Sequence, residues 1–212
     1  PQRTVDFLNQ IAPTNPLLRY SYEDHFIMRM GFTYYNTNKR IPATGVIRNT
    51  TLQPKIYTIR TAVESAGNLL YGISSAVGQH RSGGAYKIFG IQYAQYVKGE
   101  VDYMLARNFD SRSSLAFHVG FGVGVPYGNS RMLPFEKRFY AGGANGVRGW
   151  GVRTLGPGRY DSRNSVTDFI NQCGDIRLDM NIEYRTKLFW VLEGAAFVDA
   201  GNVWTIHNYE TQ

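Results

Sequence analysis

The stretch SSLAFHVGFGVGV, residues 113–125, alternates strictly between large apolar residues and small or polar ones. The set that would share one face of a strand consists of Leu115, Phe117, Val119, Phe121, Val123 and Val125. The opposite set consists of Ala116, His118, Gly120, Gly122 and Gly124. Because successive side chains of a β-strand point to opposite faces, a period of two over this length predicts a long strand with one apolar face.

The same alternation recurs along the chain and predicts about six long strands. It is clear in residues 25–35 (HFIMRMGFTYY), 89–105 (FGIQYAQYVKGEVDYML) and 175–185 (DIRLDMNIEYR), and weaker in residues 57–67 and 193–204. The segment 88–107 could form one strand of about twenty residues, whereas the usual length is about 5–6. The polar faces mix both charge signs with small residues, which is typical of a membrane barrel with a wet lumen. Alternation alone fits a soluble β-protein equally well.

The composition narrows the class of protein. The 212 residues carry a net charge of +7, but the basic residues are scattered singly, so we do not expect nucleic acid as a partner. The single cysteine, Cys173, excludes an intrachain disulfide, and the histidines show no metal-ligand spacing. Neither a long apolar run nor a signal peptide is visible. This fits either a soluble domain or a mature or excised piece of a membrane barrel.

The connections between the predicted strands differ in length. Residues 106–114 (ARNFDSRSS) and 184–190 (YRTKLFW) indicate short turns, and the segment 68–87 is longer. The connection from about 126 to 174 far exceeds the roughly 12–15 residues that ordinary loops reach. Short turns at one rim and long loops at the other are typical of bacterial outer-membrane barrels.

The long connection contains PFEKRFYAGGANGVRGWGVRTLGPG, residues 134–158, which resembles the signature of the Omp85 superfamily. Members of this family are outer-membrane barrels that insert or translocate other proteins. The matching residues are the tetrad Val147, Arg148, Gly149 and Trp150, the preceding Gly142 and Gly143, and the following Leu155, Gly156 and Pro157. NIEYR at 181–185 and FVDAGNVW at 197–204 also match in order and spacing. The sequence around residues 113–130 is most similar to TamA/TamL-type members of Bacteroidetes.

The resemblance implies an all-β fold, a transmembrane antiparallel β-barrel of sixteen strands with the long loop folded into its lumen. Residues 1–212 would form a partial barrel domain, and the loop at about 126–174 would carry the tetrad. The family's periplasmic POTRA domains and its last barrel strands have no counterpart in these residues. We therefore expect the chain to be a fragment of a larger protein.

The resemblance also implies that Arg148 meets carboxylates on the lumen wall, which residue-by-residue matching assigns to Glu183 and Asp199. The alternation independently places both acids on the polar face of their strands. A turn centred near Trp190 or Val191 would bring them nearly opposite each other, so that a guanidinium could fork between them. We expect this structural pairing rather than acid–base catalysis.

We expect the glycines of the loop to let the backbone fold tightly in a crowded lumen. Its bulky residues would pack against the wall; they are Val147, Trp150 and Leu155. A phosphate-binding loop would need a following helix and a Lys-Ser or Lys-Thr end, which this stretch lacks. The aromatic residues at strand ends fit an interfacial girdle and ordinary strand aromatics equally well; they are Tyr20, Tyr34, Tyr184, Trp190 and Trp204.

The function that the resemblance implies is the folding and insertion of other proteins in the bacterial outer membrane, without enzymatic chemistry, cofactor or metal. The expected partners are membrane lipids, client outer-membrane proteins and periplasmic or lipoprotein accessory subunits, and no nucleic acid. The alternatives are a two-partner-secretion translocator pore, the membrane anchor of a surface enzyme, and a passive porin. A hydrolase fused to the barrel would lie outside these residues, because they contain no Gly-x-Ser-x-Gly.

Overall fold

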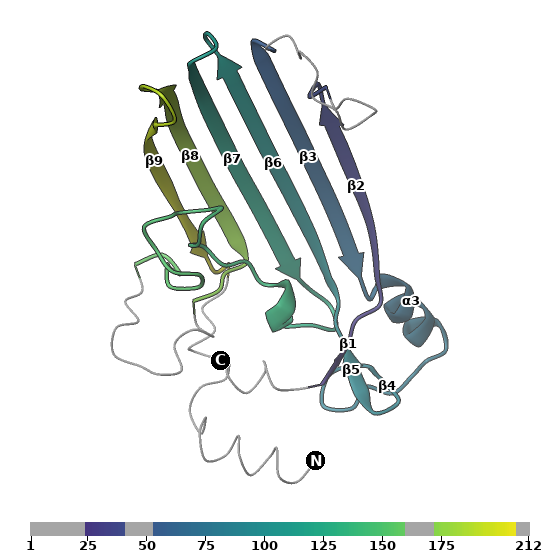
Figure 1. Cartoon of the computed structure of the whole chain (residues 1–212). Coiled ribbons are helices and arrows are strands. Elements are labelled where there is room, and N and C mark those ends of the chain that lie inside the picture. Colours follow the sequence, from purple (N-terminus) through teal and green to yellow (C-terminus); the bar gives the residue numbers. More distant parts are fainter. Residues whose placement is uncertain (1–23, 41–52, 160–171, 207–212) are drawn as a thin grey trace.

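One six-stranded antiparallel sheet dominates the fold (Figure 1). The structure, a computed structural model, describes residues 24–40, 53–159 and 172–206. The sheet has the order β2-β3-β6-β7-β8-β9, so its strands lie side by side in chain order. They are β2 (Arg29–Thr37), β3 (Lys55–Ala66), β6 (Tyr96–Asn108), β7 (Ser113–Pro126), β8 (Ile176–Lys187) and β9 (Glu193–Trp204). The prediction of a strand-rich chain with long alternating strands is confirmed, including the strand at 113–125.

The register of the strands separates an apolar face from a polar face. Directly paired residues point to the same side, so Val101, Phe121 and Leu178 share one face of β6, β7 and β8. This apolar face is largely exposed: Phe32 on β2 is 69% exposed and Val198 on β9 is 71% exposed. Every acidic residue of the six strands lies on the polar face; these are Glu64, Glu100, Asp102, Asp179, Glu183, Glu193 and Asp199.

The two ends of the sheet differ in their connections (Figure 1). At the short-turn end, β6 joins β7 through residues 109–112 and β8 joins β9 through residues 188–192, which confirms both predicted short turns. Residues 38–40 and 53–54, the described parts of the connection between β2 and β3, also lie there. At the long-connection end lie residues 67–95, 127–159 and 172–175.

The prediction of a single strand over 88–107 is wrong. The segment is divided among β4 (Lys87–Ile88), β5 (Ile91–Tyr93) and β6. Phe89 and Gly90 adopt positive φ values of 52° and 81°, and they form the turn that lets β4 pair antiparallel with β5. Apolar residues continue to alternate through this turn, so the sequence period conceals the break.

The predicted strand at 25–35 is also divided. Its first residues form β1 (His25–Phe26), which pairs in parallel with β5, and β2 begins after a gap. Strands β1, β5 and β4 form a second, small sheet near helix α3 (Asn68–Ala76) at the long-connection end (Figure 1). Gly67 at the start of α3 has φ of 73°, and a Cβ there would lie 2.3 Å from the carbonyl oxygen of Ala94. The position therefore requires glycine.

The buried core lies on the polar face toward the long-connection end, where the described residues 127–159 and 172–175 cover the sheet. One buried cluster contains Ala66, Ala94, Tyr96 and Leu133, and another contains Phe139, Ala141 and Val203. Within the described ranges, no helix has the length and hydropathy needed to cross a membrane. The number of strands in the complete sheet and its closure into a barrel stay predictions.

Candidate functional site

The glycine-rich stretch at 140–158 is an ordered, hydrogen-bonded loop. The amide of Gly143 donates to the carbonyl of Trp150 at 2.9 Å, and the amide of Trp150 donates to the carbonyl of Val147 at 3.1 Å. Ala141 forms an isolated β-bridge with Leu155. A Cβ on Gly142, whose φ is 94°, would lie 2.1 Å from the carbonyl oxygen of Gly151, so this fold of the loop depends on that glycine.

The loop presents Arg148 to carboxylates on β8 and β9. Its Nε and Nη2 donate to the two carboxylate oxygens of Asp199, each at 2.7 Å, and Nη1 donates to Glu183. The backbone amide of Arg148 also donates to Asp199 at 3.1 Å. The hydrogen bonds to Asp199 and then to Glu183 raise the pKa of Arg148 above its ordinary value, so the guanidinium stays charged. We call Arg148, Glu183 and Asp199 the Arg148 latch.

The strand register explains how the acids of the latch reach one arginine. Asp199 pairs directly with Asn181, and Glu183 pairs with Phe197, so the two acids are diagonal neighbours on the polar face. The Phe197 ring lies beneath the guanidinium, with 3.7 Å between the ring centroid and the Cζ of Arg148. Phe197 thus adds to the latch a cation–π contact that the sequence did not predict.

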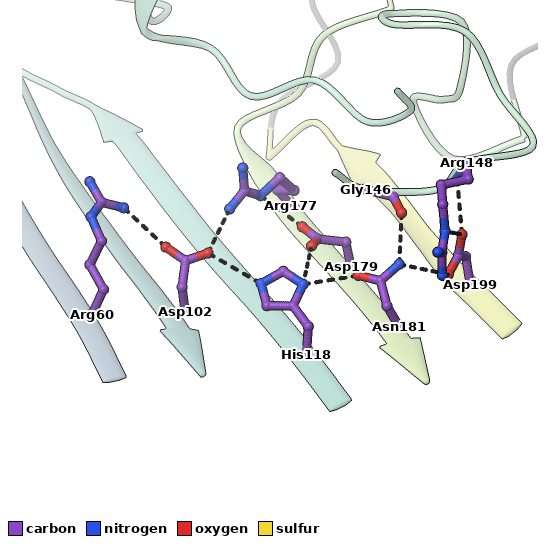
Figure 2. Close-up of polar contacts among 9 residues, drawn as sticks. All are labelled: Arg60, Asp102, His118, Gly146, Arg148, Arg177, Asp179, Asn181 and Asp199. Carbon is purple, nitrogen blue, oxygen red and sulfur yellow. Dashed lines mark hydrogen bonds and ion pairs between the residues drawn. The ribbon is translucent and has the colours of Figure 1, made fainter. Parts of the chain in front are cut away.

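Asn181 makes further contacts that the sequence did not predict. Its Nδ2 donates to the carbonyl of Gly146 in the loop at 2.7 Å and to Asp199 at 2.9 Å (Figure 2). Its Oδ1 lies 2.9 Å from Nδ1 of His118 on β7. Asn181 therefore joins the loop, β9 and β7 through a single side chain. The signal available in the sequence was its position two residues before Glu183, which places both side chains on the polar face of β8.

A charged network continues from the latch across the polar face (Figure 2). His118 lies 3.5 Å from the carboxylate of Asp179 and 3.8 Å from that of Asp102. Arg177 contacts both acids, at 3.0 Å and 3.3 Å respectively, and Arg60 on β3 contacts Asp102 at 3.0 Å. The network thus connects β3, β6, β7 and β8 on the same side as the loop.

A second set of contacts holds the beginning of the loop. The short 3-10 helix η1 (Phe135–Lys137) places the ammonium of Lys137 2.9 Å from Glu64 on β3. The Phe139 ring lies between two cations, with its centroid 4.2 Å from Nζ of Lys98 and 5.6 Å from Cζ of Arg177. The loop is therefore fastened to both halves of the sheet.

The glycines of β7 make room for these contacts. A Cβ on Gly120 would lie 2.9 Å from the carboxylate of Asp179. A Cβ on Gly122 would lie 2.5 Å from the Phe139 ring, and one on Gly124 would lie 2.7 Å from Leu133. The repeated glycines of the opening stretch thus form the surface on which the loop packs.

The remaining signature residues take different positions. Val147 is buried, and its Cγ2 lies 2.9 Å from where a Cβ on Gly201 would be. Leu155 packs against the buried cluster that contains Phe139 and Val203. Trp150 is 50% exposed within the described chain, and its packing against the wall stays a prediction. A Cβ on Gly149 would meet no heavy atom within 4 Å. Gly156 packs closely on Asn202 and Val203, and its peptide bond to Pro157 is cis.

The arrangement is suited to holding a loop rather than to bond chemistry. An open cavity of about 750 Å³ lies between the loop and the sheet, and its lining includes the charged side chains of Arg60, Asp102 and His118. Those charges are already engaged with one another in the network. Among the described residues, no group of three or more His, Cys, Asp or Glu side chains is arranged to hold a metal ion.

Comparison with known proteins agrees with the signature. Residues 17–212 match the Omp85 superfamily domain. Over 98 residues the chain is 32% identical to the outer membrane protein assembly factor BamA of Neisseria meningitidis serogroup B (strain ATCC BAA-335 / MC58). That alignment covers 42% of this chain and 11% of the relative, so the chain spans a small part of the relative's length. The family and this relative point to the bacterial outer membrane. Since the domain match takes in most of its residues, the chain belongs to the Omp85 superfamily.

Proposed function

We propose that the chain is part of a barrel that folds and inserts other proteins in the bacterial outer membrane. The observation that carries this proposal is the Arg148 latch, which fastens the signature loop to β8 and β9. A loop fastened on the polar face occupies space that a passive porin leaves open to solutes. Further support comes from the family match and from the relative, which is named as an assembly factor.

The proposed architecture is a sixteen-stranded antiparallel barrel with the apolar face toward lipid and the connection 127–175 in the lumen. Strands of about 12 residues rise about 40 Å, and a tilt of 35–45° reduces this to about 30 Å, the thickness of the hydrocarbon core. The exposed apolar face and the charged opposite face support this placement. Residues 1–212 would form one part of the barrel domain.

Within the superfamily, we assign the chain to the TamA/TamL-type members because of the sequence at 113–130. The partners in this proposal are membrane lipids, client outer-membrane proteins and periplasmic or lipoprotein accessory subunits. The role is not enzymatic and needs no cofactor or metal. The Arg148 latch and the network beside it would keep this part of the barrel wall rigid while clients fold elsewhere on the complex.

Depletion of the full-length protein tests the proposed role. We expect the levels of several unrelated outer-membrane proteins to fall while periplasmic proteins remain unchanged. Loss of one exported protein with normal outer-membrane proteins would instead indicate a secretion translocator. Reduced solute uptake with unchanged outer-membrane protein levels would indicate a porin, and either result contradicts the proposal.

Nitroxide labels on opposite faces of β6 test the proposed placement in lipid. Val101 and Met104 are comparably exposed, at 42% and 50%, but they lie on the apolar and polar faces respectively. In bilayers containing the full-length protein, we expect a label at Val101 to be accessible to oxygen and shielded from a water-soluble relaxation reagent. The label at Met104 should show lower oxygen accessibility. Equal behaviour of the two labels would contradict a lipid-facing apolar face.

A further inference from the structure

The apolar face contains one pair of charged residues. Within the six described strands, its charged side chains are Lys55 on β3 and Arg107 on β6, and both are cations. They are direct cross-strand partners at the short-turn end, Lys55 at the start of its strand and Arg107 one residue before the end of its own. Both side chains are exposed.

This pairing is unfavourable unless an anion lies near it. Directly opposite residues of an antiparallel pair have Cβ atoms about 4.5–5.5 Å apart, and like charges at that distance destabilise the sheet. The acids of the strands lie on the other face, and neither cation makes an ion pair with any residue in the described part of the chain. Arg107 has instead the Phe109 ring nearby, with 5.8 Å between its Cζ and the ring centroid.

The surroundings of the pair have the composition of a membrane boundary. Tyr57 follows Lys55 on the same face of β3, and farther along that face lie Ile59, Thr61 and Val63. On this strand a tyrosine therefore stands between the cation and a mostly apolar stretch, which is where tyrosine concentrates between hydrocarbon and head groups.

The neighbouring turn gives independent support for a membrane boundary at this end. Every residue from Leu188 to Leu192 is apolar and exposed, and Trp190 is 95% exposed. The turn is held in place by a hydrogen bond from the Leu188 amide to the Leu192 carbonyl at 3.0 Å and by one from the Lys187 amide to the Arg112 carbonyl at 2.8 Å. A rigid turn that displays Trp and Phe to solvent fits the lipid interface, where such side chains concentrate.

We infer that Lys55 and Arg107 together bind the phosphate of an anionic phospholipid in the leaflet at the short-turn end. The acyl chains of that lipid lie along the apolar face, and its phosphate relieves the repulsion between the two cations. This inference rests on the proposed placement of the apolar face against lipid. A soluble phosphate would explain the pair of cations, but it would not explain the adjoining apolar and aromatic surface.

Native mass spectrometry of the full-length protein in mixed phosphatidylcholine and phosphatidylglycerol tests the inference. We expect the wild-type protein to retain phosphatidylglycerol in preference to phosphatidylcholine. Each of Lys55→Gln and Arg107→Gln should weaken that retention by about fivefold, and the double variant by the product. Lys55→Arg should keep it. The matched control is Lys87→Gln with Arg131→Gln, which removes the same charge at the long-connection end and should leave the preference unchanged.

The inference is overturned by equal retention of both lipids by the wild type, by undiminished preference in the double variant, or by an equal loss in the control. Displacement of the lipid by inorganic phosphate in the buffer would assign the cations to a soluble anion, which also overturns it. The nitroxide at Val101, measured in the same bilayers, separates the two proposals. If that label contacts lipid and no head-group preference is found, the lipid site fails and the proposed placement in the membrane stands.

Discussion

The geometry of the latch explains why position 148 carries arginine. Nε and Nη2 bind the two oxygens of Asp199 side by side, Nη1 turns to Glu183, and the flat guanidinium stacks on Phe197. Lysine offers a compact ammonium with three donors, which cannot reproduce the side-by-side pair of bonds to Asp199 or the flat stacking on Phe197. The latch therefore depends on the shape of the cation as well as its charge.

We predict that Arg148→Lys releases the loop nearly as much as Arg148→Ala does. Hydrogen exchange should accelerate by about tenfold at the loop amides that are now bonded, such as those of Gly143 and Trp150. Arg131→Ala, which removes an exposed cation elsewhere in the same connection, is the control and should leave these rates unchanged. If the loop amides of Arg148→Lys exchange as slowly as those of the wild type, then the charge alone holds the loop.

The loop packs directly on the glycines of β7. Gly122 has an ordinary backbone conformation, so alanine there is unfavourable only because its methyl group meets the Phe139 ring at 2.5 Å. We expect Gly122→Ala to lower the free energy of unfolding by about 1–3 kcal/mol, the usual cost of overpacking. Gly99→Ala is the matched control, because no heavy atom lies within 4 Å of a Cβ at that position. Urea unfolding of the full-length protein should separate the two; equal stabilities would show that the loop does not press on β7.

The turn between β6 and β7 depends on one carboxylate. Asp110 accepts hydrogen bonds from the amides of Arg112 and Ser113, at 2.6 and 2.7 Å, and from the Ser113 hydroxyl at 2.9 Å. The bond from the Arg112 amide contributes most, and together these bonds lower the pKa of Asp110 below its ordinary value of 3.8.

We predict that this turn loosens only in acid. Because the pKa of Asp110 is depressed in the folded chain, its stabilising effect is complete above pH 3.8 and is lost as the pH falls through the folded pKa. Exchange of the Ser113 amide, corrected for the intrinsic pH dependence, should therefore rise below about pH 4 in the wild type. Asp110→Asn should abolish that dependence, and an unchanged profile in this variant would exclude Asp110 as its source.

The connection 127–175 also shields Cys173. The thiol is fully buried beside the bridge between Phe139 and Gly174, and burial raises its pKa above the ordinary value. We expect maleimide to modify Cys173 in the folded protein far more slowly than in the urea-unfolded protein. Comparable rates would show that this part of the connection opens readily.

The sequence period predicted the long strands well, and it failed where apolar residues alternate through a break. In β7 and β8 the alternation agrees with the register residue by residue. At Phe89 and Gly90 the period continues although the backbone turns, because a turn is determined by φ values and the side-chain pattern does not record them.

The candidate site was predictable only in part, for a related reason. Alternation located Glu183 and Asp199 on the polar face, and the resemblance supplied Arg148. Asn181 and Phe197 share that face, but nothing in the sequence shows that the loop descends onto them. Likewise, the sequence shows that the β7 residues are small, but it does not show that Phe139 and Leu133 of the loop pack directly on them.

The polar face of the sheet carries both the charge network and the loop, and the apolar face remains open. The charged groups from Arg60 to Arg148 satisfy one another across neighbouring strands. Such a network resists sliding of one strand past the next, since a shift by one residue would turn every charge to the apolar face. The loop adds contacts to β3 through Lys137 and to β9 through Arg148, so it braces the sheet across its width.

A crosslink between the loop and β9 tests whether the proposed function needs the loop to stay fastened. A Cβ on Gly201 would lie 2.9 Å from Cγ2 of Val147, so Val147→Cys with Gly201→Cys can be bridged by a disulfide. The same Cβ would lie 2.8 Å from the carbonyl oxygen of Leu178, so the backbone must shift slightly to admit the new side chain. We predict that Arg148→Ala lowers outer-membrane protein levels in cells and that adding the crosslink restores them. The restoration should require oxidising conditions, and Val147→Cys alone and Gly201→Cys alone are the controls.

The crosslink alone, in a chain that keeps Arg148, distinguishes a static brace from a moving part. If the loop must remain on the sheet, this variant should support normal levels of outer-membrane proteins. If those levels fall and reduction of the disulfide restores them, then the loop has to leave β9 during the working cycle, and the latch is a reversible contact rather than a permanent one. The second result would contradict the brace while leaving the geometry of Arg148, Glu183 and Asp199 as the closed state of that cycle.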